Sequence, residues 1–591
     1  MMKAKWIEIR KGADFGAIAS KFHISPITSR LIRNKNIVGD EAIEAYLHGG
    51  LEQLHDGILM KDMKKAVDII SEKIQQNQKI RIIGDYDIDG VNATYILLEG
   101  LQRIGANVDS DIPHRMKEGY GLNIELIERA VEAGIDTIIT CDNGIAAKGE
   151  IAYAKEQGMT VIVTDHHEVP YEDEMVAEEV IRTYLLPDAD AVIDPKQVDC
   201  EYPFKNLCGA AVAYKFIECL YQVIGEDPED VDDLMEQVAI ATIGDVMELD
   251  GENRIFVKQG LEMLKRTKNI GLNELLELTV PDRNMLNAYK IGFVIGPCMN
   301  ACGRLDTAKR ALELMCIKEK KQAQLLASEL VALNENRKKL TDEGVKQAVE
   351  IVEQELLDDK ILVVFLPECH ESLAGIIAGR IRERYYKPTF VLTRGESGVK
   401  GSGRSIDAYH MYEELNKCKD LFTKYGGHKL AAGLSMEEKN VDKFRRTLNQ
   451  ISTLTQDDLI ETIFIDMQVA PSYMNETVIE ELSYLEPFGK GNTKPHFAEK
   501  DMEIIQFRVV GKNQNVVKLR LKEMNGYTVD AVYFNGAEKM EQDIIDKYGN
   551  SALESIKKSV PAGVKFAMIY YPEINEYQGR RTVQVMVQHY R

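Results

Sequence analysis

The sequence predicts a multidomain α/β protein built from a parallel-sheet domain, a long connecting helix, a second α/β lobe and a C-terminal β-barrel. Three observations predict this architecture. Between residues 79 and 194, short apolar runs alternate with amphipathic segments, which is typical of parallel strands joined by crossover helices. Residues 318–358 contain no proline and a single glycine, so they favour one long helix. From about residue 461, short alternating strands separated by turns favour a small barrel.

Length and composition limit the class of protein. The chain has 591 residues, which at roughly 150 residues per domain suggests about four domains. Apolar residues make up 45% and charged residues 28%, and no apolar run reaches the roughly 18 residues that a membrane span requires. The N-terminus lacks the apolar core of a secretory signal, and the nine cysteines show no paired spacing. We therefore expect a cytoplasmic protein with reduced thiols and no membrane partner.

We expect the N-terminal residues to form a helical cap that precedes the parallel sheet. Residues 1–60 show a mainly helical pattern with few strand signals, and the sheet domain is expected over residues 61–317. In such sheets ligands collect at the carboxyl ends of the strands, so residues directly after each strand are candidates for a functional site. The expected strands are residues 79–84, 107–112, 136–141, 159–164 and 191–194.

Three aspartates, Asp85, Asp87 and Asp89, follow the first expected strand. In extended backbone this spacing would project all three carboxylates to one side, where like charges would repel by roughly several kcal/mol unless a cation neutralised them. Mg²⁺ and Mn²⁺ prefer oxygen ligands of this kind. Taken alone, the same residues suit a polar turn after a strand equally well.

Chemistry-bearing residues also follow two later strands. Asp142 stands directly after residues 136–141, and Asp165, His166 and His167 stand directly after residues 159–164. An isolated Asp-His-His triplet would more often be a turn with a satisfied histidine. Three clusters at strand ends of one sheet instead predict that oxygen and imidazole ligands converge on one metal site.

The second half of the chain is expected to hold the substrate. The connecting helix is expected over residues 318–358, an α/β lobe over residues 359–455 and the barrel over residues 456–591. Gly-rich turns of the second lobe carry candidate phosphate-binding residues, because bare backbone N–H groups and guanidinium groups bind phosphate well. These candidates are Ser402, Arg404, Gly427 and His428, with Arg115 and Arg304 contributed by the first lobe. Arginines beside glycines are otherwise mostly solvated surface.

Taken by itself, the formal charge of −22 argues against nucleic acid as a partner. Carboxylates that bind metal and an acidic helical surface can set this total while one face stays basic. From Ile377 to Ser405 the chain has seven Lys or Arg against two Glu. Local charge matters most, because phosphates respond to charges within a Debye length of roughly 8 Å.

Nine short motifs resemble a known family. GDYDIDG, CDNG, TDHH and ATIGDVMEL resemble four successive motifs of the DHH superfamily of phosphoesterases. IPHRMKEGYGL, GPCMNACGRL, GSGRS, GGHKLAAG and LEPFGKGN are similar to motifs of the RecJ family, which are bacterial single-strand-specific DNA exonucleases. The resemblance spans most of the chain. It departs at Cys298 and Cys302, where many family members carry arginine and alanine, and the first change removes one expected phosphate contact.

The resemblance implies a DHH domain, a DHHA1-like second lobe, an OB-fold barrel and two Mn²⁺ or Mg²⁺ ions. Some superfamily members begin the first motif with a histidine ligand, and since this chain has none there, Asp85 is expected to complete the ligand set. Asp165 is expected to orient an imidazole, and His167 to face substrate as a general acid or phosphate donor. The implied metal ligands are Asp85, Asp87, Asp89, Asp142, His166 and Asp245, the last of which only the resemblance selects.

The function that the resemblance implies is 5′-to-3′ hydrolysis of single-stranded DNA to 5′-mononucleotides in recombination and repair, through two metal ions. Two alternatives stay open. A small-nucleotide or oligoribonucleotide phosphodiesterase would leave the barrel without a role, and a non-catalytic replication scaffold would show eroded ligands. A single-strand-binding protein and a RecQ-type helicase are the protein partners to consider, although the sequence does not identify them. The barrel is expected to bind single strands by base stacking, with a purely structural barrel as the alternative.

Overall fold

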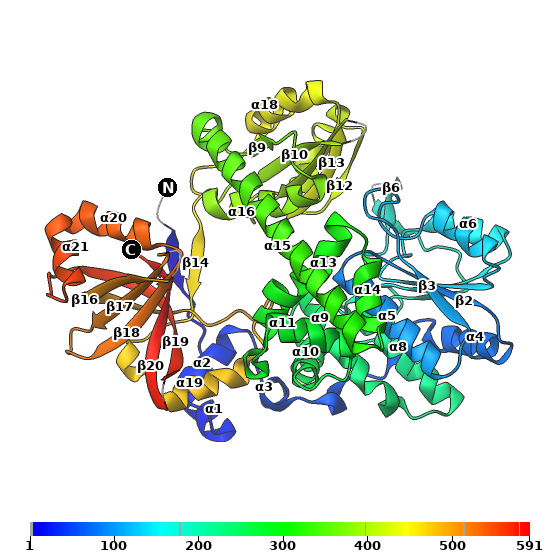
Figure 1. Cartoon of the computed structure of the whole chain (residues 1–591), viewed down its shortest axis with the longest axis horizontal. Helices are drawn as coiled ribbons and strands as arrows, with labels where there is room; N and C mark the ends of the chain where they lie inside the picture. The colour runs from blue at the N-terminus through cyan, green and yellow to red at the C-terminus, as the bar shows by residue number, and fades with distance from the viewer. Residues whose placement is uncertain (1–3, 177–178, 396–397, 512–513, 578) are drawn as a thin grey trace. The chain divides into compact units, whose positions relative to one another are not determined.

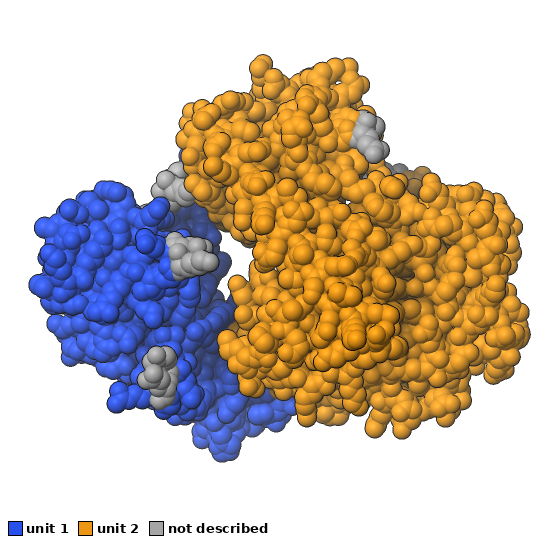
Figure 2. All heavy atoms as spheres, in the orientation of Figure 1, with its two compact units in different colours: residues 1–49, 455–486, 493–591 blue, residues 50–454, 487–492 orange. Residues whose placement is uncertain are grey.

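The computed structural model describes residues 4–176, 179–395, 398–511, 514–577 and 579–591. The chain divides into two compact units (Figure 2). Unit 1 comprises residues 1–49, 455–486 and 493–591, and unit 2 comprises residues 50–454 and 487–492. Within the described ranges, no helix is both long enough and apolar enough to cross a membrane.

Unit 2 contains the predicted parallel sheet, which has the strand order β3-β2-β4-β5-β8. Figure 1 labels β2 and β3. All four pairings are parallel, as the alternation of strand and helix patterns indicates. The strands are β2 (Ile80–Gly84), β3 (Val108–Asp111), β4 (Thr137–Cys141), β5 (Thr160–Thr164) and β8 (Ala191–Ile193). Every residue of β4 is buried, because this central strand is covered on both faces.

Helices cover both faces of this sheet and form two separate cores. One core includes residues of α4 (Met63–Gln75), α5 (Ile88–Arg103) and α8 (Gly209–Ile224). The other includes residues of α6 (Ile124–Glu132) and α7 (Lys148–Glu156). After β5 the chain also forms an antiparallel hairpin that the sequence pattern did not predict, made of β6 (Tyr171–Val176) and β7 (Glu179–Tyr184).

A helical region follows the sheet and leads into the connecting helix. The predicted helix over residues 318–358 is confirmed as α15 (Lys320–Ile351), which a π-helical turn (Val352–Leu356) extends. Gly303 allows α13 (Gly296–Leu305) to lie close to the carbonyl oxygen of Tyr86, since a Cβ atom on Gly303 would be 2.6 Å from that oxygen. The other helices are α9 (Met235–Gly244), α10 (Gly251–Leu264), α11 (Ile270–Thr279), α12 (Ala288–Lys290), α13 (Gly296–Leu305) and α14 (Lys309–Cys316), with a π-helical turn (Ile291–Ile295) before α13.

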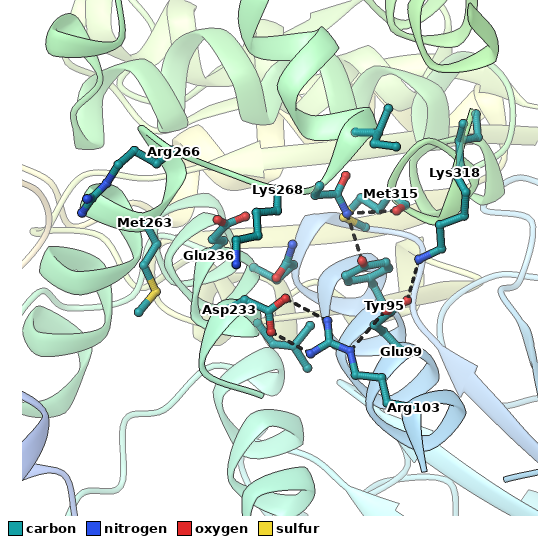
Figure 3. A pocket seen from close by; sticks show the side chains of 15 residues that line it. Tyr95, Glu99, Arg103, Asp233, Glu236, Met263, Arg266, Lys268, Met315 and Lys318 are labelled. Carbon is teal, nitrogen blue, oxygen red and sulfur yellow. Dashed lines mark hydrogen bonds and ion pairs between the residues drawn. The ribbon is translucent and has the colours of Figure 1, made fainter. Parts of the chain in front are cut away.

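A cavity of about 490 Å³ lies beside α5 and the start of α9 (Figure 3). Its polar side chains are largely paired: the Arg103 guanidinium binds both carboxylate oxygens of Asp233 at 2.7 and 2.8 Å. Glu236 is buried here and accepts a hydrogen bond from the Thr267 hydroxyl at 2.6 Å. Burial raises the pKa of Glu236 to about 7. None of the predicted site residues lines this cavity.

The second lobe is a five-stranded mixed sheet with order β12-β13-β11-β10-β9. Its α/β character confirms the prediction from the apolar run at residues 361–366. The β9–β10 pair is parallel and the others are antiparallel. The elements are β9 (Leu362–Phe365), α16 (Ala374–Tyr385), β10 (Thr389–Gly395), β11 (Gly398–Arg404), α17 (Met411–Asn416), β12 (Lys424–Gly427), β13 (Ala431–Met436) and α18 (Val441–Ile451).

Unit 1 contains the predicted C-terminal barrel. Strands pair in the order β16-β17-β18-β20-β19, and an additional β16–β19 pairing closes the ring. Closure leaves these five strands without a free edge. Two helices that the sequence pattern did not predict lie between β18 and β19. The elements are α19 (Glu476–Leu482), β15 (Met467–Gln468), β16 (Phe497–Val510), β17 (Val516–Lys522), β18 (Thr528–Phe534), α20 (Ala537–Tyr548), α21 (Asn550–Lys557), β19 (Lys565–Tyr577) and β20 (Arg580–Tyr590).

The N-terminal residues are mainly helical, as predicted, but they begin with a strand. The helices are α1 (Phe15–Phe22), α2 (Pro26–Asn34) and α3 (Asp40–His48). Strand β1 (Lys5–Glu8) pairs in parallel with β14 (Thr462–Ile465). The sequence pattern missed β1 because four residues carry little periodic signal and their partner strand lies far along the chain.

Candidate metal centre

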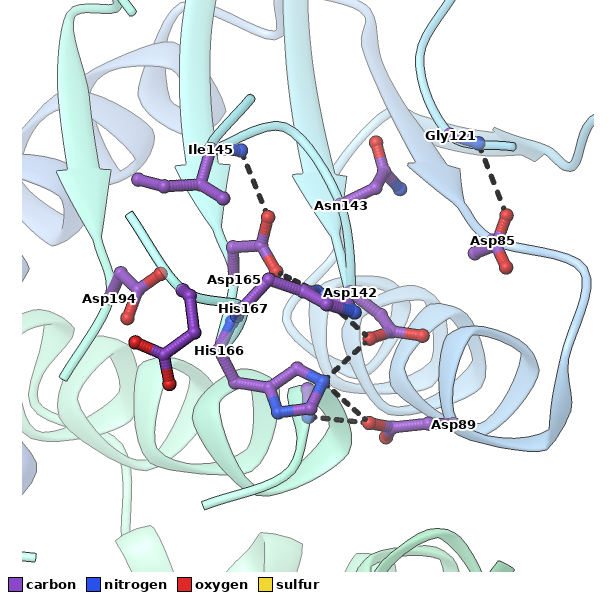
Figure 4. Close-up of polar contacts among 12 residues, drawn as sticks. Asp85, Asp89, Gly121, Asp142, Asn143, Ile145, Asp165, His166, His167 and Asp194 are labelled. Carbon is purple, nitrogen blue, oxygen red and sulfur yellow. Dashed lines mark hydrogen bonds and ion pairs between the residues drawn. The ribbon is translucent and has the colours of Figure 1, made fainter. Parts of the chain in front are cut away.

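Residues from three strand ends meet at one point in unit 2, as the sheet topology predicts. Asp85 follows β2, Asp142 follows β4 and His166 follows β5. The Nε2 atom of His166 lies 3.0 Å from an Asp142 oxygen, 3.5 Å from an Asp89 oxygen and 4.0 Å from an Asp245 oxygen. Figure 4 shows Asp89, Asp142 and His166 pointing toward one another, with Asp85 beside them. The predicted convergence is confirmed.

The prediction that Asp85, Asp87 and Asp89 project to one side of an extended backbone is wrong, because Asp89 lies in a helix. Asp87 is the N-cap of α5, and its Oδ1 accepts hydrogen bonds from the backbone N–H groups of Asp89 at 2.9 Å and Gly90 at 3.1 Å. Because this cap starts the helix at Ile88, Asp89 reaches the centre from the first helical turn. Backbone N–H groups at the start of α8 donate to both Asp89 oxygens at 2.7 Å.

Asp245 reaches the same point from the end of a helix. It is the C-cap of α9, and a Cβ atom on the preceding Gly244 would lie 2.5 Å from Ile88. The absence of that atom brings the two chain segments together. The next residue, Val246, has φ of 58°, a left-handed conformation that costs a β-branched residue roughly 1–3 kcal/mol. The backbone is therefore strained directly beside Asp245.

Potential ligand atoms form three overlapping groups, and within each group all atoms lie within 4.8 Å of one another. Asp142 belongs to two of the groups, as does His166. Such an arrangement can hold two cations side by side with a shared carboxylate. The groups are Asp85, Asp87 and Asp142; Asp89, His166 and Asp245; and Asp142, His166 and His167.

The electrostatics of these carboxylates show that the site needs positive charge. Burial and the charges of neighbouring aspartates raise the pKa of Asp85 to about 8 and that of Asp245 to about 7. The same two causes hold the pKa values of Asp89 and Asp142 well above their usual range. The Oδ2 atom of Asp85 is buried without a hydrogen-bond partner. A donor set of oxygens and one imidazole, crowded in this way, fits Mg²⁺ or Mn²⁺.

The two histidines are in different protonation states. Burial, together with the charge of His167, lowers the pKa of His166 to about 3, so its imidazole is neutral as a metal ligand must be. Burial alone would also lower the pKa of His167. However, a 2.7 Å hydrogen bond to Asp165 and the charge of that carboxylate raise it to about 9, so His167 is protonated at neutral pH.

Asp165 fixes the conformation of the loop after β5, which carries both histidines. Its Oδ1 accepts hydrogen bonds from the backbone N–H groups of His166 at 2.7 Å and His167 at 3.2 Å, and its Oδ2 accepts one from Ile145 at 2.9 Å (Figure 4). Although burial raises its pKa, the hydrogen bond and charge of His167 hold it below the usual range. Both oxygens are thus occupied with orienting the loop.

Three of the predicted phosphate-binding residues gather near this centre. The Arg115 guanidinium lies 4.7 Å from the ring centroid of Tyr86, and Arg304 donates to the Ser372 carbonyl at 2.8 Å. Arg404 donates to the carbonyl of Gly403 at 2.8 Å. Burial and the positive charges of neighbouring arginines, Arg115 first, lower the pKa of Arg304 to about 10. The structure therefore brings these three arginines into one electrostatic environment.

The prediction that Ser402 and Arg404 sit in a Gly-rich turn is wrong, because both lie within strand β11. The glycines here serve packing: a Cβ atom at Gly401 would lie 2.4 Å from Leu392, and one at Gly403 would lie 2.4 Å from Met411.

Gly427 does end a strand, β12, with φ of 146°, and His428 follows in the turn. His428 is exposed, and its backbone N–H donates to the carbonyl of Ala431 at 2.9 Å. Among the described residues, no hydrogen bond or ion pair joins the His428 side chain to the aspartates or arginines above.

Sequence reasoning missed three residues beside the site. Asp194 follows β8, is fully buried and has a pKa raised to about 8 by burial and the charge of Asp165. The strand-end rule would have found it. Tyr120 donates its hydroxyl to the Asp142 carbonyl at 2.9 Å, and Arg337 of α15 lies close enough for its charge to affect Arg304. Tyr120 falls within the motif IPHRMKEGYGL, which could have pointed to it, whereas Arg337 carries no local sequence signal.

Three family models match the chain in the order of its parts. The model of the DHH family N-terminal domain matches residues 79–242, that of the DHHA1 domain matches residues 358–453, and that of the RecJ OB domain matches residues 465–589. The matched segments correspond to the parallel-sheet region, the second lobe and the barrel.

Curated relatives and solved structures match nearly the whole chain. The single-stranded-DNA-specific exonuclease RecJ of Bacillus subtilis is 35% identical over 590 residues, which is 99% of this chain and 70% of the relative. That of Haemophilus influenzae is 31% identical and 95% of each chain is covered. The crystal structure of RecJ in complex with Mn²⁺ from Thermus thermophilus matches with a TM-score of 0.81 and 26% identity, covering 99% of this chain and 79% of that one.

Proposed function

The chain belongs to the RecJ family of single-stranded-DNA-specific exonucleases, and on that premise we propose that it hydrolyses single-stranded DNA from the 5′ end and releases 5′-mononucleotides. The observation that carries this proposal is the set of three overlapping ligand groups, two of which contain Asp142 and two of which contain His166. Ionised carboxylates that are crowded in this way repel one another, which is why their pKa values are raised. Bound divalent cations would neutralise this repulsion and favour the ionised forms. The chemistry of these residues is that of metal-dependent phosphodiester hydrolysis.

We propose that two Mn²⁺ or Mg²⁺ ions bind here. Asp85, Asp87 and Asp142 would hold one ion, and Asp89, His166 and Asp245 would hold the other. Asp142, whose Oδ1 lies 3.0 Å from the Nε2 atom of His166, would be shared between them. Bound divalent cations lower the pKa of water and neutralise negative charge that develops on phosphate oxygens. Relatives of this kind have been crystallised with Mn²⁺ and with Mg²⁺.

The protein's own residues complete the site. His167 is protonated at neutral pH and its side chain is 45% exposed, so it can donate a proton or a hydrogen bond to a phosphate oxygen. Asp165 orients this imidazole through the 2.7 Å hydrogen bond and keeps it charged. A neutral His166 imidazole has one ring nitrogen with a lone pair, which would bind a cation held by the carboxylates. These roles follow from the opposite protonation states of the two histidines.

We further propose that Arg115, Arg304 and Arg404 bind phosphates of the strand, with Ser402, Gly427 and His428 contributing from the second lobe. Guanidinium groups without carboxylate partners are suited to phosphate, which they bind bidentately. The barrel of unit 1 would engage further nucleotides by base stacking. The two predicted protein partners, a single-strand-binding protein and a RecQ-type helicase, remain predictions.

The two alternatives have less support. A non-catalytic scaffold predicts missing ligands, whereas each of the six proposed ligands belongs to at least one of the ligand groups. A small-nucleotide phosphodiesterase would not need the closed barrel that matches the RecJ OB domain.

An end-label assay tests the proposal. Oligonucleotides labelled at the 5′ or the 3′ end, as single or double strands, would be incubated with Mn²⁺, Mg²⁺ or a chelator. We expect labelled mononucleotide to appear first from the 5′ label, only on single strands and only with metal. An RNA strand of the same sequence serves as a further substrate. Degradation that begins at the 3′ end, or that continues in chelator, would contradict the proposal.

A further inference from the structure

The cavity beside α5 and the start of α9 contains buried polar groups that no protein group satisfies (Figure 3). Gln237 lines it and is only 2% exposed, and its Oε1 atom is buried without a hydrogen-bond partner. Glu236 is 5% exposed and uses Oε2 to accept the hydrogen bond from Thr267. Among the described residues, no hydrogen bond reaches its Oε1. Because buried polar groups without partners are unfavourable, these two side chains suit a ligand that supplies hydrogen bonds.

Two cations at the rim of this cavity have no carboxylate partner. Other charges of the wall are paired, as where Lys318 lies 3.2 Å from Glu99. Arg266 and Lys268 also line the cavity and are both exposed. Within the described ranges of the chain, no ion pair of 4.0 Å or less joins either of them to a carboxylate. Figure 3 shows Lys268 extending toward Glu236, on which its charge acts. The rim therefore suits a ligand with a phosphate or another anionic group.

The rest of the wall suits an aromatic ring. Met263 and Met315 line the cavity, and thioether groups make favourable contacts with aromatic rings. Tyr95 is buried and accepts a hydrogen bond from the Asn269 amide at 2.9 Å. No acceptor for its own hydroxyl proton occurs in the part of the chain that the structure describes. The cavity volume of about 490 Å³ lies in the range of small-molecule sites, roughly 300–1,000 Å³. Together these features describe an aromatic ligand with a polar edge and an anionic group.

The cavity is separate from the metal centre, although two helices reach both. Gln237 lies near the start of α9, and Asp245 caps the other end of that helix. Glu99 lies in the second half of α5, whose first turn carries Asp89. At 1.5 Å per residue, the members of these pairs are about 12 and 15 Å apart along their helices. A ligand in the cavity would therefore lie outside the metal centre.

We infer that this cavity is a second ligand site, which binds a nucleoside monophosphate. The base would lie beside the two thioether groups, with its hydrogen-bonding edge toward Gln237 and Glu236. The phosphate would lie at the rim beside Lys268 and Arg266. A nucleoside monophosphate combines the aromatic ring, the polar edge and the anionic group that the wall suits. The inference rests on the proposed function only for the source of the ligand, since the proposed exonuclease would release this class of molecule.

Isothermal titration calorimetry tests the inference. The probes are the four deoxynucleoside 5′-monophosphates, with thymidine and inorganic phosphate for comparison. All titrations contain chelator, so that the carboxylates of the metal centre stay negative and disfavour anions there. Each titration is repeated with Arg404→Ala, which removes a residue of the proposed strand site and leaves the wall of the cavity unchanged. Thermal unfolding of each variant checks that the fold is intact. We expect nucleotide binding that persists in Arg404→Ala.

Two variants test the two parts of the cavity. Gln237→Leu should weaken binding of thymidine monophosphate by about 10- to 100-fold, the effect of losing one or two buried hydrogen bonds. It should not lower the unfolding temperature of the free protein, because the amide that is lost has no protein partner for its oxygen. Lys268→Ala should weaken binding of thymidine monophosphate by about three- to tenfold and leave that of thymidine unchanged. Lys265→Ala is the matched control, since Glu262 lies 2.5 Å from that lysine, and it should change neither affinity.

Three results would overturn the inference. The first is no binding of any of the four nucleotides at about 1 mM, the weak limit of specific association. The second is binding that Arg404→Ala abolishes and Gln237→Leu leaves unchanged, which would place the nucleotide in the strand site. The third is equal affinity for inorganic phosphate and for the nucleotides, which would indicate a simple anion site. Because none of these measurements involves cleavage, the inference and the proposed function can fail independently of each other.

Discussion

Unit 2 holds two clusters of like charge that are built in opposite ways. The carboxylates of the metal centre stand on strand ends and helix caps, and backbone N–H groups fix several of them, as at Asp87 and Asp89. The arginine cluster (Arg115, Arg304, Arg337 and Arg404) stands on long side chains from four different elements. Carbonyl or amide oxygens hold Arg304, Arg337 and Arg404, whereas Arg115 lies over the ring of Tyr86. The first cluster is rigid because the backbone positions it, whereas the second can adapt its side chains to a ligand.

This difference matches the demands of the two proposed ligands. Metal ions require ligand atoms at nearly fixed distances, so short side chains on a rigid backbone suit them. A nucleic-acid strand moves through the site after each cleavage, and flexible guanidinium groups can bind successive phosphates. The comparison predicts that changes in the first cluster abolish the reaction, whereas changes in the second weaken substrate binding.

The largest expected effect is that of Asp142→Asn. Asn tolerates the left-handed φ of 60° at this position, so the fold should be kept. Loss of a carboxylate shared by both proposed ions should lower kcat by about 1,000-fold or more, because several kcal/mol of transition-state stabilisation depend on the metals. In chelator the variant should be at least as stable as the wild type, since one repelling charge is gone.

Measurement of bound Mn²⁺ and of cleavage rate checks this expectation. Asp109→Asn is a suitable control, because Asp109 pairs with Arg81 at 2.7 Å on the same sheet but lies outside the ligand groups. If a folded Asp142→Asn variant cleaved DNA at the wild-type rate, the proposed difference between the two clusters would be wrong.

Arg404→Ala should have a smaller effect of a different kind. We expect KM to rise by about 10- to 100-fold through loss of a charged phosphate contact, with bound Mn²⁺ unchanged. His428→Ala should behave similarly but more weakly, because His428 is exposed. Arg394→Ala is the matched control, since that arginine pairs with Glu438 at 2.9 Å. Loss of metal from the Arg404 variant would show that the two clusters are not separate.

Glu236 is a buried carboxyl that lies outside both clusters, so it can be compared with the aspartates of the metal centre. Its folded pKa of about 7 lies above the unfolded value of 4.5, so its stabilising contribution is present below pH 4.5 and is lost as pH rises through about 7. Glu236→Gln should therefore stabilise the protein at pH 8 by on the order of 2 kcal/mol and have little effect at pH 4 to 5. Thermal unfolding with and without Mn²⁺ measures this.

Added Mn²⁺ should stabilise the wild type and the Glu236→Gln variant equally, because Glu236 belongs to no ligand group. A variant with the same pH profile as the wild type would mean that folding does not raise the pKa of this carboxyl above its unfolded value.

The smallest expected effect is that of Val246→Asn. Relief of the left-handed strain at φ of 58° should stabilise the protein by about 1 kcal/mol in chelator. If the strain helps to place Asp245, the affinity for the second Mn²⁺ should fall slightly at the same time. Val246→Ile keeps the β-branch and serves as the control. Equal unfolding temperatures for the two variants would show that the backbone is not strained.

The sequence predicted the carboxylate cluster better than the arginine cluster, for a physical reason. Parallel strands bring their carboxyl ends to one edge, so Asp85, Asp142 and His166 could be placed together from their positions after strands. The same rule failed for Asp89, because the N-cap at Asp87 turns the chain into a helix. Asp245 follows a helix, and only the family resemblance selected it.

Other features could not be predicted because their signals lie far apart in the chain. An arginine within a helix, such as Arg337, looks like a solvated residue until its tertiary neighbours are known. Glycines around Ser402 suggested a turn, but they allow close packing of a strand. The closed barrel followed from alternating strands, whereas β1 needed a partner, β14, from the other end of the sequence.

The central claim is that the carboxylate cluster holds two cations that share Asp142. Anomalous X-ray scattering from crystals of the wild-type protein grown with Mn²⁺ tests it most directly. We predict two peaks per chain, one bound by Asp85, Asp87 and Asp142 and the other by Asp89, His166 and Asp245, with Asp142 in contact with both. A single peak, or two peaks that do not share Asp142, would contradict the account.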